Sequence, residues 1–250
     1  MTAGEKFEGR EAERRVKRRN RWLIYTAGML VLALGLTLNT KTGLGVSPIL
    51  SLSYSSAEIW GLTFGDTTFL LYALFVAGQL VLRGSGRQWY DLLQLPLSLV
   101  FSRVLNLLDR AIPYNPDAHG LGANLAVLAL AILVTGTGVS MTVNMRLVPN
   151  PGDGIVQALA DRMGRDQGYA KNLFDLCCVT LTVLLCLITM GEIVGVGLGT
   201  VAAMVGVGRA IALVNRLFQE KMCRAAGMAY QGGEREDEEG AARAASGSGE

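Results

Sequence analysis

The chain has 250 residues, of which 50% are apolar and only 18% are charged, a balance that favours a helical membrane bundle over soluble domains. The net charge of +2 averages a basic head, a nearly uncharged middle and an acidic tail, and no nucleic-acid partner is expected. The single histidine, His119, has no thiol or carboxylate cluster beside it in the sequence. This pattern argues against a zinc enzyme or a catalytic triad, so no enzyme activity, metal or cofactor is expected.

The first 20 residues are charged, and six basic residues between Arg14 and Arg21 precede the first apolar run, Trp22–Leu38. This run is long for a signal peptide, and no small-residue cleavage site follows it. We therefore predict an uncleaved first spanning helix whose basic flank, residues 1–20, stays in the cytoplasm.

A polar, glycine-broken stretch, Asn39–Pro48, follows the first helix. Ser47 followed by Pro48 predicts an N-cap and the first residue of a helix. The helix predicted after it, Ile49–Trp60, is too short to cross a hydrocarbon core of roughly 30 Å. Two further spans complete a first membrane repeat over residues 21–109, and residues 110–120 form a linker. The predicted spans are Thr67–Leu82 and Leu92–Leu108, the second distorted at Pro96.

The second half repeats this order. The predicted spans are Leu121–Thr142, Lys171–Met190 and Ile193–Phe218, and the short piece is Ile155–Met163 after the broken stretch Asn144–Gly154. These elements make a second membrane repeat over residues 121–218. Residues 219–250 are polar and acidic, which predicts a disordered cytoplasmic tail.

An offset of 103 residues aligns the two halves without a gap. It pairs Pro48 with Pro151, Gly61 with Gly164, Gly65 with Gly168 and Gly35 with Gly138. Matching prolines and glycines around one short segment indicate an internal duplication. Short, Gly/Pro-interrupted segments at matching positions of two halves also point to the binding site of a transporter.

Two topologies compete. Four full crossings per copy would make the copies parallel, whereas three crossings would place the second copy upside down. With three crossings, Arg83, Arg87, Arg146, Arg162, Arg165 and Lys171 join the basic head on the cytoplasmic side. Cytoplasmic loops collect lysine and arginine, so we predict an all-α polytopic protein of two inverted three-helix repeats, each with one short broken or re-entrant helix. Both termini are then cytoplasmic.

In this arrangement the broken stretches Asn39–Ser47 and Asn144–Asn150 enter from opposite faces as extended chain. The short helices then start near the membrane midplane, with their N-termini facing each other. Free N–H groups and the positive end of the helix dipole would favour an anion or the negative end of a small polar solute.

Three segments carry a family resemblance: GLGVSP (43–48), VPNPGDG (148–154) with Phe174-Asp175, and VGVGLGTV (194–201). Together they resemble the YczE/YyaS/YitT-type bacterial integral membrane proteins, over most of the chain between the two tails. The resemblance implies a small multi-span protein of the bacterial inner membrane, in a family without a settled activity that is loosely regarded as transporters.

Polar residues within apolar segments are the candidate substrate-binding residues. Lys171 and Asp175 lie four residues apart on one helix face, and an isolated ion there is costly in hydrocarbon. Arg103 and Arg209 lie within the last span of each copy and could pair with Asp175 or bind an anion. Asp153, Asn150 and Ser47 start the short helices, where capping alone would also explain them. A structural ion pair is the competing interpretation for the charged residues.

We expect a permease for a small solute or ion that works through the paired half-helices, with the lipid bilayer as its surroundings and a homo-oligomer left open. The alternative is a non-transporting membrane protein that supports an exporter or a biosynthetic assembly. A membrane-embedded enzyme ranks third. The glycines from 195 to 199 favour close helix packing of the GxxxG kind over a dinucleotide site.

Overall fold

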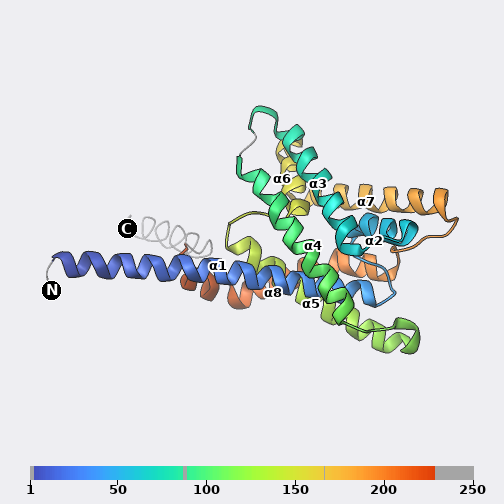
Figure 1. Cartoon of the computed structure of the whole chain (residues 1–250), viewed down its shortest axis with the longest axis horizontal. Helices are drawn as coiled ribbons and strands as arrows, with labels where there is room; N and C mark the ends of the chain where they lie inside the picture. The colour runs from blue at the N-terminus through green and yellow to red at the C-terminus, as the bar shows by residue number, and fades with distance from the viewer. Residues whose placement is uncertain (1–2, 87–88, 166, 229–250) are drawn as a thin grey trace, which may run out of the picture.

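The computed structural model describes residues 3–86, 89–165 and 167–228, which form eight α-helices and three short 3-10 turns (Figure 1). The α-helices are α1 (Ala3–Lys41), α2 (Pro48–Trp60), α3 (Phe64–Arg83), α4 (Gln94–Ala111), α5 (Leu121–Asn144), α6 (Pro151–Met163), α7 (Gln167–Thr189) and α8 (Leu198–Ala226). The prediction of an all-α protein is confirmed.

Six of these helices are long and apolar enough to cross a membrane: α1, α3, α4, α5, α7 and α8. The other two, α2 and α6, have 13 residues each, or about 20 Å at 1.5 Å per residue. A helix of that length does not reach across the hydrocarbon core. The predicted order of spans and short helices is therefore the observed order.

The repeated segment folds into the same helix twice. Both α2 and α6 begin with a proline, at Pro48 and Pro151, where the missing N–H costs no intrahelical hydrogen bond. Both end at a glycine in the left-handed conformation, Gly61 with φ 63° and Gly164 with φ 62°. Glycine adopts this conformation without the steric penalty that a Cβ atom imposes on other residues. The residues at the two ends of the duplicated segment thus fix the length of each short helix.

Helices α1 and α5 pack closely and run antiparallel. Gly28 of α1 lies beside Thr142 of α5, whereas Gly35, further along α1, lies beside Thr135. Gly138 of α5 in turn lies against the backbone of Leu32. The offset of 103 converts Gly35 to Gly138 and Leu32 to Thr135, so the two glycine contacts are equivalents of each other.

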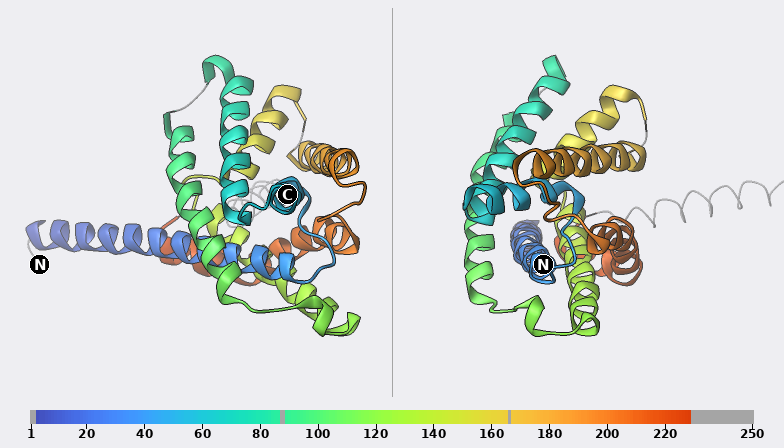
Figure 2. Two further views of the ribbon diagram at one scale, coloured as in Figure 1. Left: turned by 45° about the vertical axis from the view of Figure 1, so that its right-hand side comes forward. Right: turned by 90° about the vertical axis from the view of Figure 1, so that its right-hand side faces the viewer.

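Each short helix packs on the third helix segment of its own half and on that of the other half. Helix α2 contacts α3 and α7, and α6 contacts α7 and α3 (Figures 1 and 2). The first turns of the short helices also meet, because Ile49 of α2 lies about 3.5 Å from where a Cβ on Gly152 of α6 would stand. Gly152 is the residue equivalent to Ile49. The N-termini of α2 and α6 therefore adjoin inside the bundle.

Polar side chains join helices within this apolar bundle. Asn144 of α5 donates to Asn215 of α8 at 2.8 Å and accepts from Gln219 at 2.9 Å. Ser51 of α2 lies 2.8 Å from Thr182 of α7, hydroxyl to hydroxyl. Such bonds satisfy groups that lipid could not.

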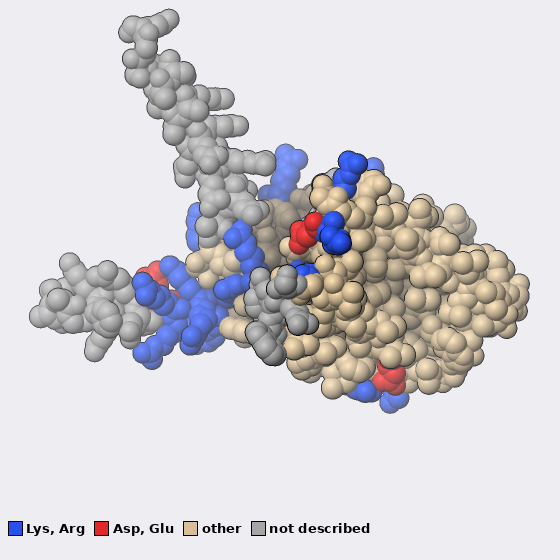
Figure 3. Space-filling view, turned by 90° about the horizontal axis from the view of Figure 1, so that it is seen from above, with Lys and Arg blue, Asp and Glu red and all other residues tan. Residues whose placement is uncertain are grey.

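Charged side chains are unevenly distributed over the surface. Figure 3 shows lysine and arginine side chains gathered toward the end from which α1 projects, while most of the remaining visible face carries no charge. Exposed leucine and valine side chains cover much of the outer surface of α3, α4, α7 and α8. A broad uncharged belt with charges at its margin suits a protein embedded in a bilayer.

Some local details differ from the sequence predictions. Helix α1 continues through Asn39 to Lys41, so the first broken stretch is shorter than expected. Pro96 is the third residue of α4, where no N–H is needed, and does not distort the middle of a helix. Gly195 precedes α8 with φ 80°, so the expected GxxxG contact between helices is replaced by loop packing. Residues 219–226 were predicted to belong to a disordered tail, but they form the last turns of α8. Residues 229–250 of that predicted tail lie outside the described residues.

We predict that Gly138→Ala destabilises the protein by about 1 to 3 kcal/mol, the usual cost of overpacking. The added methyl group would overlap the backbone of Leu32, which cannot turn aside as a side-chain tip can. Thermal unfolding in detergent, read by circular dichroism, measures the change.

Gly208→Ala is the matched control, because a Cβ on Gly208 meets nothing within 4 Å. This variant should be as stable as the original protein or slightly more so, since alanine favours the helix. Equal melting temperatures for the two variants would show that the α1–α5 contact is looser than described.

Candidate functional site

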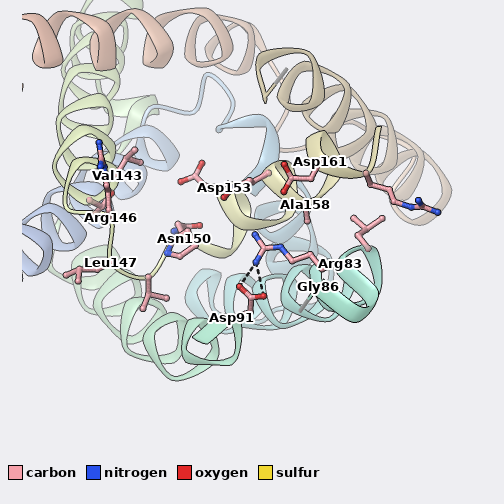
Figure 4. Close-up of a pocket in the computed structure, with 16 residues that line it drawn as sticks. Arg83, Gly86, Asp91, Val143, Arg146, Leu147, Asn150, Asp153, Ala158 and Asp161 are labelled. Atoms are coloured by element: carbon pink, nitrogen blue, oxygen red, sulfur yellow. Dashed lines mark hydrogen bonds and ion pairs between the residues drawn. The ribbon is translucent and has the colours of Figure 1, made fainter. Parts of the chain in front are cut away.

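A cavity of about 910 Å³ opens at the end of the bundle where the basic residues gather. Its walls are the C-terminal ends of α3 and α5, the connection between α5 and α6, and one side of α6 (Figure 4). The charged residues that line it are Arg83, Asp91, Arg146, Asp153, Asp161 and Arg162. The volume is within the range of small-molecule sites, which is about 300 to 1,000 Å³.

The connection from α5 to α6 is held by two residues of α1. Arg21 donates from Nε to the carbonyl oxygen of Met145 and from Nη2 to that of Arg146, both at 2.7 Å. Tyr25 donates from its hydroxyl to the carbonyl oxygen of Val148 at 2.9 Å. These bonds satisfy carbonyl groups that the end of α5 leaves without a helical partner, and they fix the approach to α6.

The first turn of α6 forms the inner wall of the cavity. The side-chain oxygen of Asn150 accepts from the Gly152 N–H at 3.0 Å, so Asn150 is an N-cap as predicted. Asp153, one residue further, is half-buried and lines the cavity. Its carboxylate stands at the positive end of the helix dipole, which it partly neutralises. A free anion is therefore attracted to α6 less strongly than the bare helix terminus would suggest.

Lys171 and Asp175 form the ion pair that their spacing allows. The Lys171 Nζ lies 3.0 and 3.2 Å from the two carboxylate oxygens of Asp175. Asp175 is 1% exposed, whereas the Lys171 side chain is 46% exposed. Asp153 is close enough for its charge to interact with both residues. The structure thus brings together three of the predicted residues, two acids and one lysine.

The other predicted residues lie elsewhere. Arg103 on α4 pairs with Asp66 of α3 at 2.7 Å on the surface, and not with Asp175. Arg209 lies on the exposed face of α8. Ser47 precedes α2 but its side chain makes no capping hydrogen bond. These three residues are separate from the cavity lining.

Two polar pairs beside the cavity were not predicted. Arg83 at the end of α3 donates from Nη1 to both carboxylate oxygens of Asp91, at 2.7 and 2.8 Å (Figure 4). Gln79 accepts from Gln94 at 3.2 Å, and both glutamines are fully buried. The sequence signal that could have predicted the Gln79–Gln94 pair was the presence of one glutamine in each of two apolar segments. Gly154 of α6 lies against Gln79, so a Cβ there would displace the glutamine.

Metal ligands do not cluster in the part of the chain that the structure describes. No group of three or more histidine, cysteine, aspartate or glutamate side chains there could hold a metal ion.

Comparison with known proteins places this architecture in a family. The model of the Family of unknown function (DUF6198) matches residues 19–216, from the end of the basic head to late in α8. The chain belongs to this family. A relative, the "Uncharacterized membrane protein YczE" of Bacillus subtilis (strain 168), is 26% identical over 187 residues, or 74% of this chain and 82% of that protein. No solved structure matches.

These matches confirm the predicted resemblance to YczE-type membrane proteins. Together with the six spanning helices, they identify this member of the DUF6198 family as a multi-pass integral membrane protein.

In this DUF6198 protein, we predict that Lys171→Met lowers stability by about 1 to 3 kcal/mol. The substitution leaves the Asp175 carboxylate buried and unpaired, and the exposure of Lys171 moderates the cost below that of a fully buried pair. Adding Asp175→Asn should restore part of the loss, which thermal unfolding of both single variants and the double variant measures.

Arg103→Met is the control, because its ion pair with Asp66 is exposed on both sides. This change should cost less than about 1 kcal/mol. A cost equal to that of Lys171→Met would mean that burial of Asp175 does not matter.

Proposed function

We propose that this protein is a permease for a small polar solute or ion, built from two inverted repeats that expose a central site to each side of the inner membrane in turn. Both termini are cytoplasmic in this proposal, so the large cavity opens to the cytoplasm. The concentration of lysine and arginine at that end supports the orientation.

The antiparallel contact of α1 and α5 supports the inversion. These helices are equivalents under the offset of 103, and their glycine contacts are equivalents too. A two-fold axis that exchanges two antiparallel helices runs across them. For helices that span a bilayer, such an axis lies close to the membrane plane, which is the geometry of inverted-topology transporters.

The observation that carries the proposal is a second cavity, of about 400 Å³, at the equivalent position of the other repeat. Seven residues that line the larger cavity have equivalents, under the offset of 103, in the lining of the smaller one. The pairs are Val143 and Thr40, Arg146 and Gly43, Leu147 and Leu44, Val148 and Gly45, Pro149 and Val46, Gln157 and Tyr54, and Asp91 and Val194. The two cavities lie at opposite ends of the spanning part of α1. At one end Arg21 bonds the carbonyl oxygen of Met145, beside the larger cavity, and at the other end Thr40 lines the smaller cavity.

The smaller cavity is narrowed by the connection between α7 and α8. Val46 donates its N–H to the carbonyl oxygen of Gly195 at 2.9 Å, and Gly199 donates to that of Leu44 at 2.6 Å. The Ser55 hydroxyl donates to the carbonyl oxygen of Val194, also at 2.6 Å. At the equivalent place in the other repeat, Asp91 bonds Arg83 and the cavity stays wide. Equivalent hollows of unequal size favour a carrier caught open to one side.

The first turns of the short helices are in contact, since Ile49 of α2 lies against Gly152 of α6. In this proposal the contact closes the path between the two cavities. This apolar contact favours alternating access over a continuous channel. The proposal therefore assigns solute passage to exchange between two unequal states.

Cysteine labelling tests the inversion. The background is a variant in which the four native cysteines are replaced, and the reagent is a membrane-impermeant maleimide. Gln157→Cys should react in inverted vesicles, where the cytoplasmic face is outside, and its equivalent Tyr54→Cys should react in right-side-out vesicles. Gln157→Cys should react faster, because it lines the wider cavity. Labelling of both from the same side would remove the inverted relation.

Flux into proteoliposomes tests transport itself. A panel of labelled ions, sugars and amino acids should include at least one solute that the purified protein moves. Val143→Trp, which fills the larger cavity from the end of α5, should abolish most of that flux. Leu130→Trp is the matched control on the same helix, since Leu130 is similarly exposed but lies outside the lining.

If folded protein moves no solute of the panel, the non-transporting accessory role gains. If Val143→Trp and Leu130→Trp transport equally, the solute path does not pass through the larger cavity.

A further inference from the structure

We infer that Asp153 binds the coupling proton of the proposed permease, and that it takes this proton from the water of the larger cavity. The inference rests on the proposed function and names the coupling ion of that same site. Asp153 belongs to a group of three charged side chains, with Lys171 and Asp175, which we call the acid–lysine cluster. Only Asp153 of the three lines the cavity (Figure 4).

The packing of α6 against α7 brings the two acids near each other. Val156 of α6 and Phe174 of α7 belong to one apolar cluster, together with Ala170. Asp153 lies one turn before Val156, and Asp175 directly follows Phe174. The two carboxylates therefore lie beside the same contact between the helices, within range of each other's charge.

Two carboxylates share one ammonium group in the acid–lysine cluster. The Lys171 Nζ lies 3.0 and 3.2 Å from the two carboxylate oxygens of Asp175, which is 1% exposed. The Asp153 carboxylate makes no hydrogen bond or ion pair with a residue in the described ranges, although its charge interacts with both of the others. With both acids ionised, the cluster thus carries one surplus negative charge.

The fold does not require charged side chains at the positions of this cluster. The equivalent residues of the first repeat, under the offset of 103, are uncharged and buried: Leu50, Thr68 and Tyr72. The same positions are therefore filled without charge in one half of the protein. Ionisable residues at membrane depth are costly, so a set that the fold does not need indicates a functional site.

The groups around Asp153 leave its surplus charge in place. From α3, the neutral phenol of Tyr72 lies near it, and from α7 it faces Lys171 and Asp175. The Lys171 ammonium group is already engaged by Asp175. The remaining charged residues of the cavity lining are Arg83, which pairs with Asp91, and Arg146, Asp161 and Arg162, which are exposed.

A proton removes the surplus charge at Asp153. Burial and a neighbouring carboxylate both favour the neutral acid over the ion. Asp153 is the acid that takes the proton, because Asp175 already accepts two hydrogen bonds from Lys171 and does not face the cavity. One carboxylate oxygen gains an O–H bond, the proton comes from cavity water, and no other bond changes.

Proton binding then controls the exchange between the two states of the carrier. When the larger cavity closes, Asp153 loses contact with cavity water. An ionised carboxylate without a partner is far more costly in that setting than a neutral acid. The cavity therefore closes readily only after Asp153 has bound a proton, and solute passage depends on the proton concentration on the side of the larger cavity.

Infrared difference spectroscopy of the purified full chain in lipid tests proton binding without any solute. The original protein should keep the carbonyl band of a protonated carboxylic acid at a pH where the exposed Asp161 is already ionised. This persistent band should be missing in Asp153→Asn. Asp161→Asn is the matched control on the same helix and should retain the band. If Asp153→Asn does not fold, Asp153→Glu should retain a persistent band with altered frequency.

Removal of the second acid tests the sharing of Lys171. In Asp175→Asn the ammonium group serves Asp153 alone, so the persistent band should disappear at a pH lower by about 1 unit or more. Loss of the band at every pH in this variant would show that Asp175, and not Asp153, holds the proton.

Flux in proteoliposomes with equal pH on both sides tests the coupling. For a solute of the panel that the protein moves, the exchange rate should fall about 10-fold per pH unit once Asp153 is ionised, because only the protonated fraction is competent. Asp153→Asn, which has no ionisable group at this position, should exchange solute at a rate that changes less than about 2-fold over the same range. Asp117→Asn, outside the cavity, should keep the original pH dependence.

Three results would overturn the inference. The first is ionisation of Asp153 over the same pH range as Asp161, and the second is an unchanged pH dependence of flux in Asp153→Asn. Flux of the original protein that does not vary with pH would reject the coupling proton and leave the permease in place. Absence of flux for every solute would instead contradict the proposed function, and the infrared band distinguishes that failure from failure of proton binding.

Discussion

The antiparallel contact between α1 and α5 is the constraint on which the arrangement depends. Gly35 and Gly138 let the two backbones approach, and side chains at either position would separate them. In lipid, where apolar association gives no driving force between helices, such close packing is a main source of adhesion. Around this pair of helices, each short helix packs on both α3 and α7, one from each half of the chain.

The segments that lead into the two short helices carry backbone N–H and C=O groups that need hydrogen-bond partners. Chain that is not helical survives at membrane depth only when protein buries it or water reaches it. Here the segment that leads into α6 is held by Arg21 and Tyr25, and the segment that leads into α2 is bonded to Gly195 and Gly199. Several backbone groups of the two segments are thus satisfied, but by different partners. In the proposed carrier this difference gives the two cavities unequal sizes, because the second set of bonds ties the connection between α7 and α8 to the first repeat.

The sequence predicted the order of the long and short helices because the signals were local and strong. Apolar length separated the spans from the two short helices, and Pro48, Pro151, Gly61 and Gly164 marked the ends of the latter. The pairing of Lys171 with Asp175 followed from helical spacing alone. Contacts between distant segments could not be predicted in the same way. Arg83 met Asp91 through a turn whose geometry no periodicity encodes, and Arg103 pointed away from the bundle because the rotation of α4 is set by packing.

The apolar contact at Ile49 has a consequence for the electric field across the membrane. In the proposed topology, water in the two cavities would conduct, so the membrane voltage would fall mainly over the protein that separates them. A charge that moves from one cavity to the other would then experience much of the full voltage, which is worth about 2.3 kcal/mol per elementary charge at 100 mV. A solute with no net charge would be nearly insensitive to that voltage, whereas an ion would be driven by it.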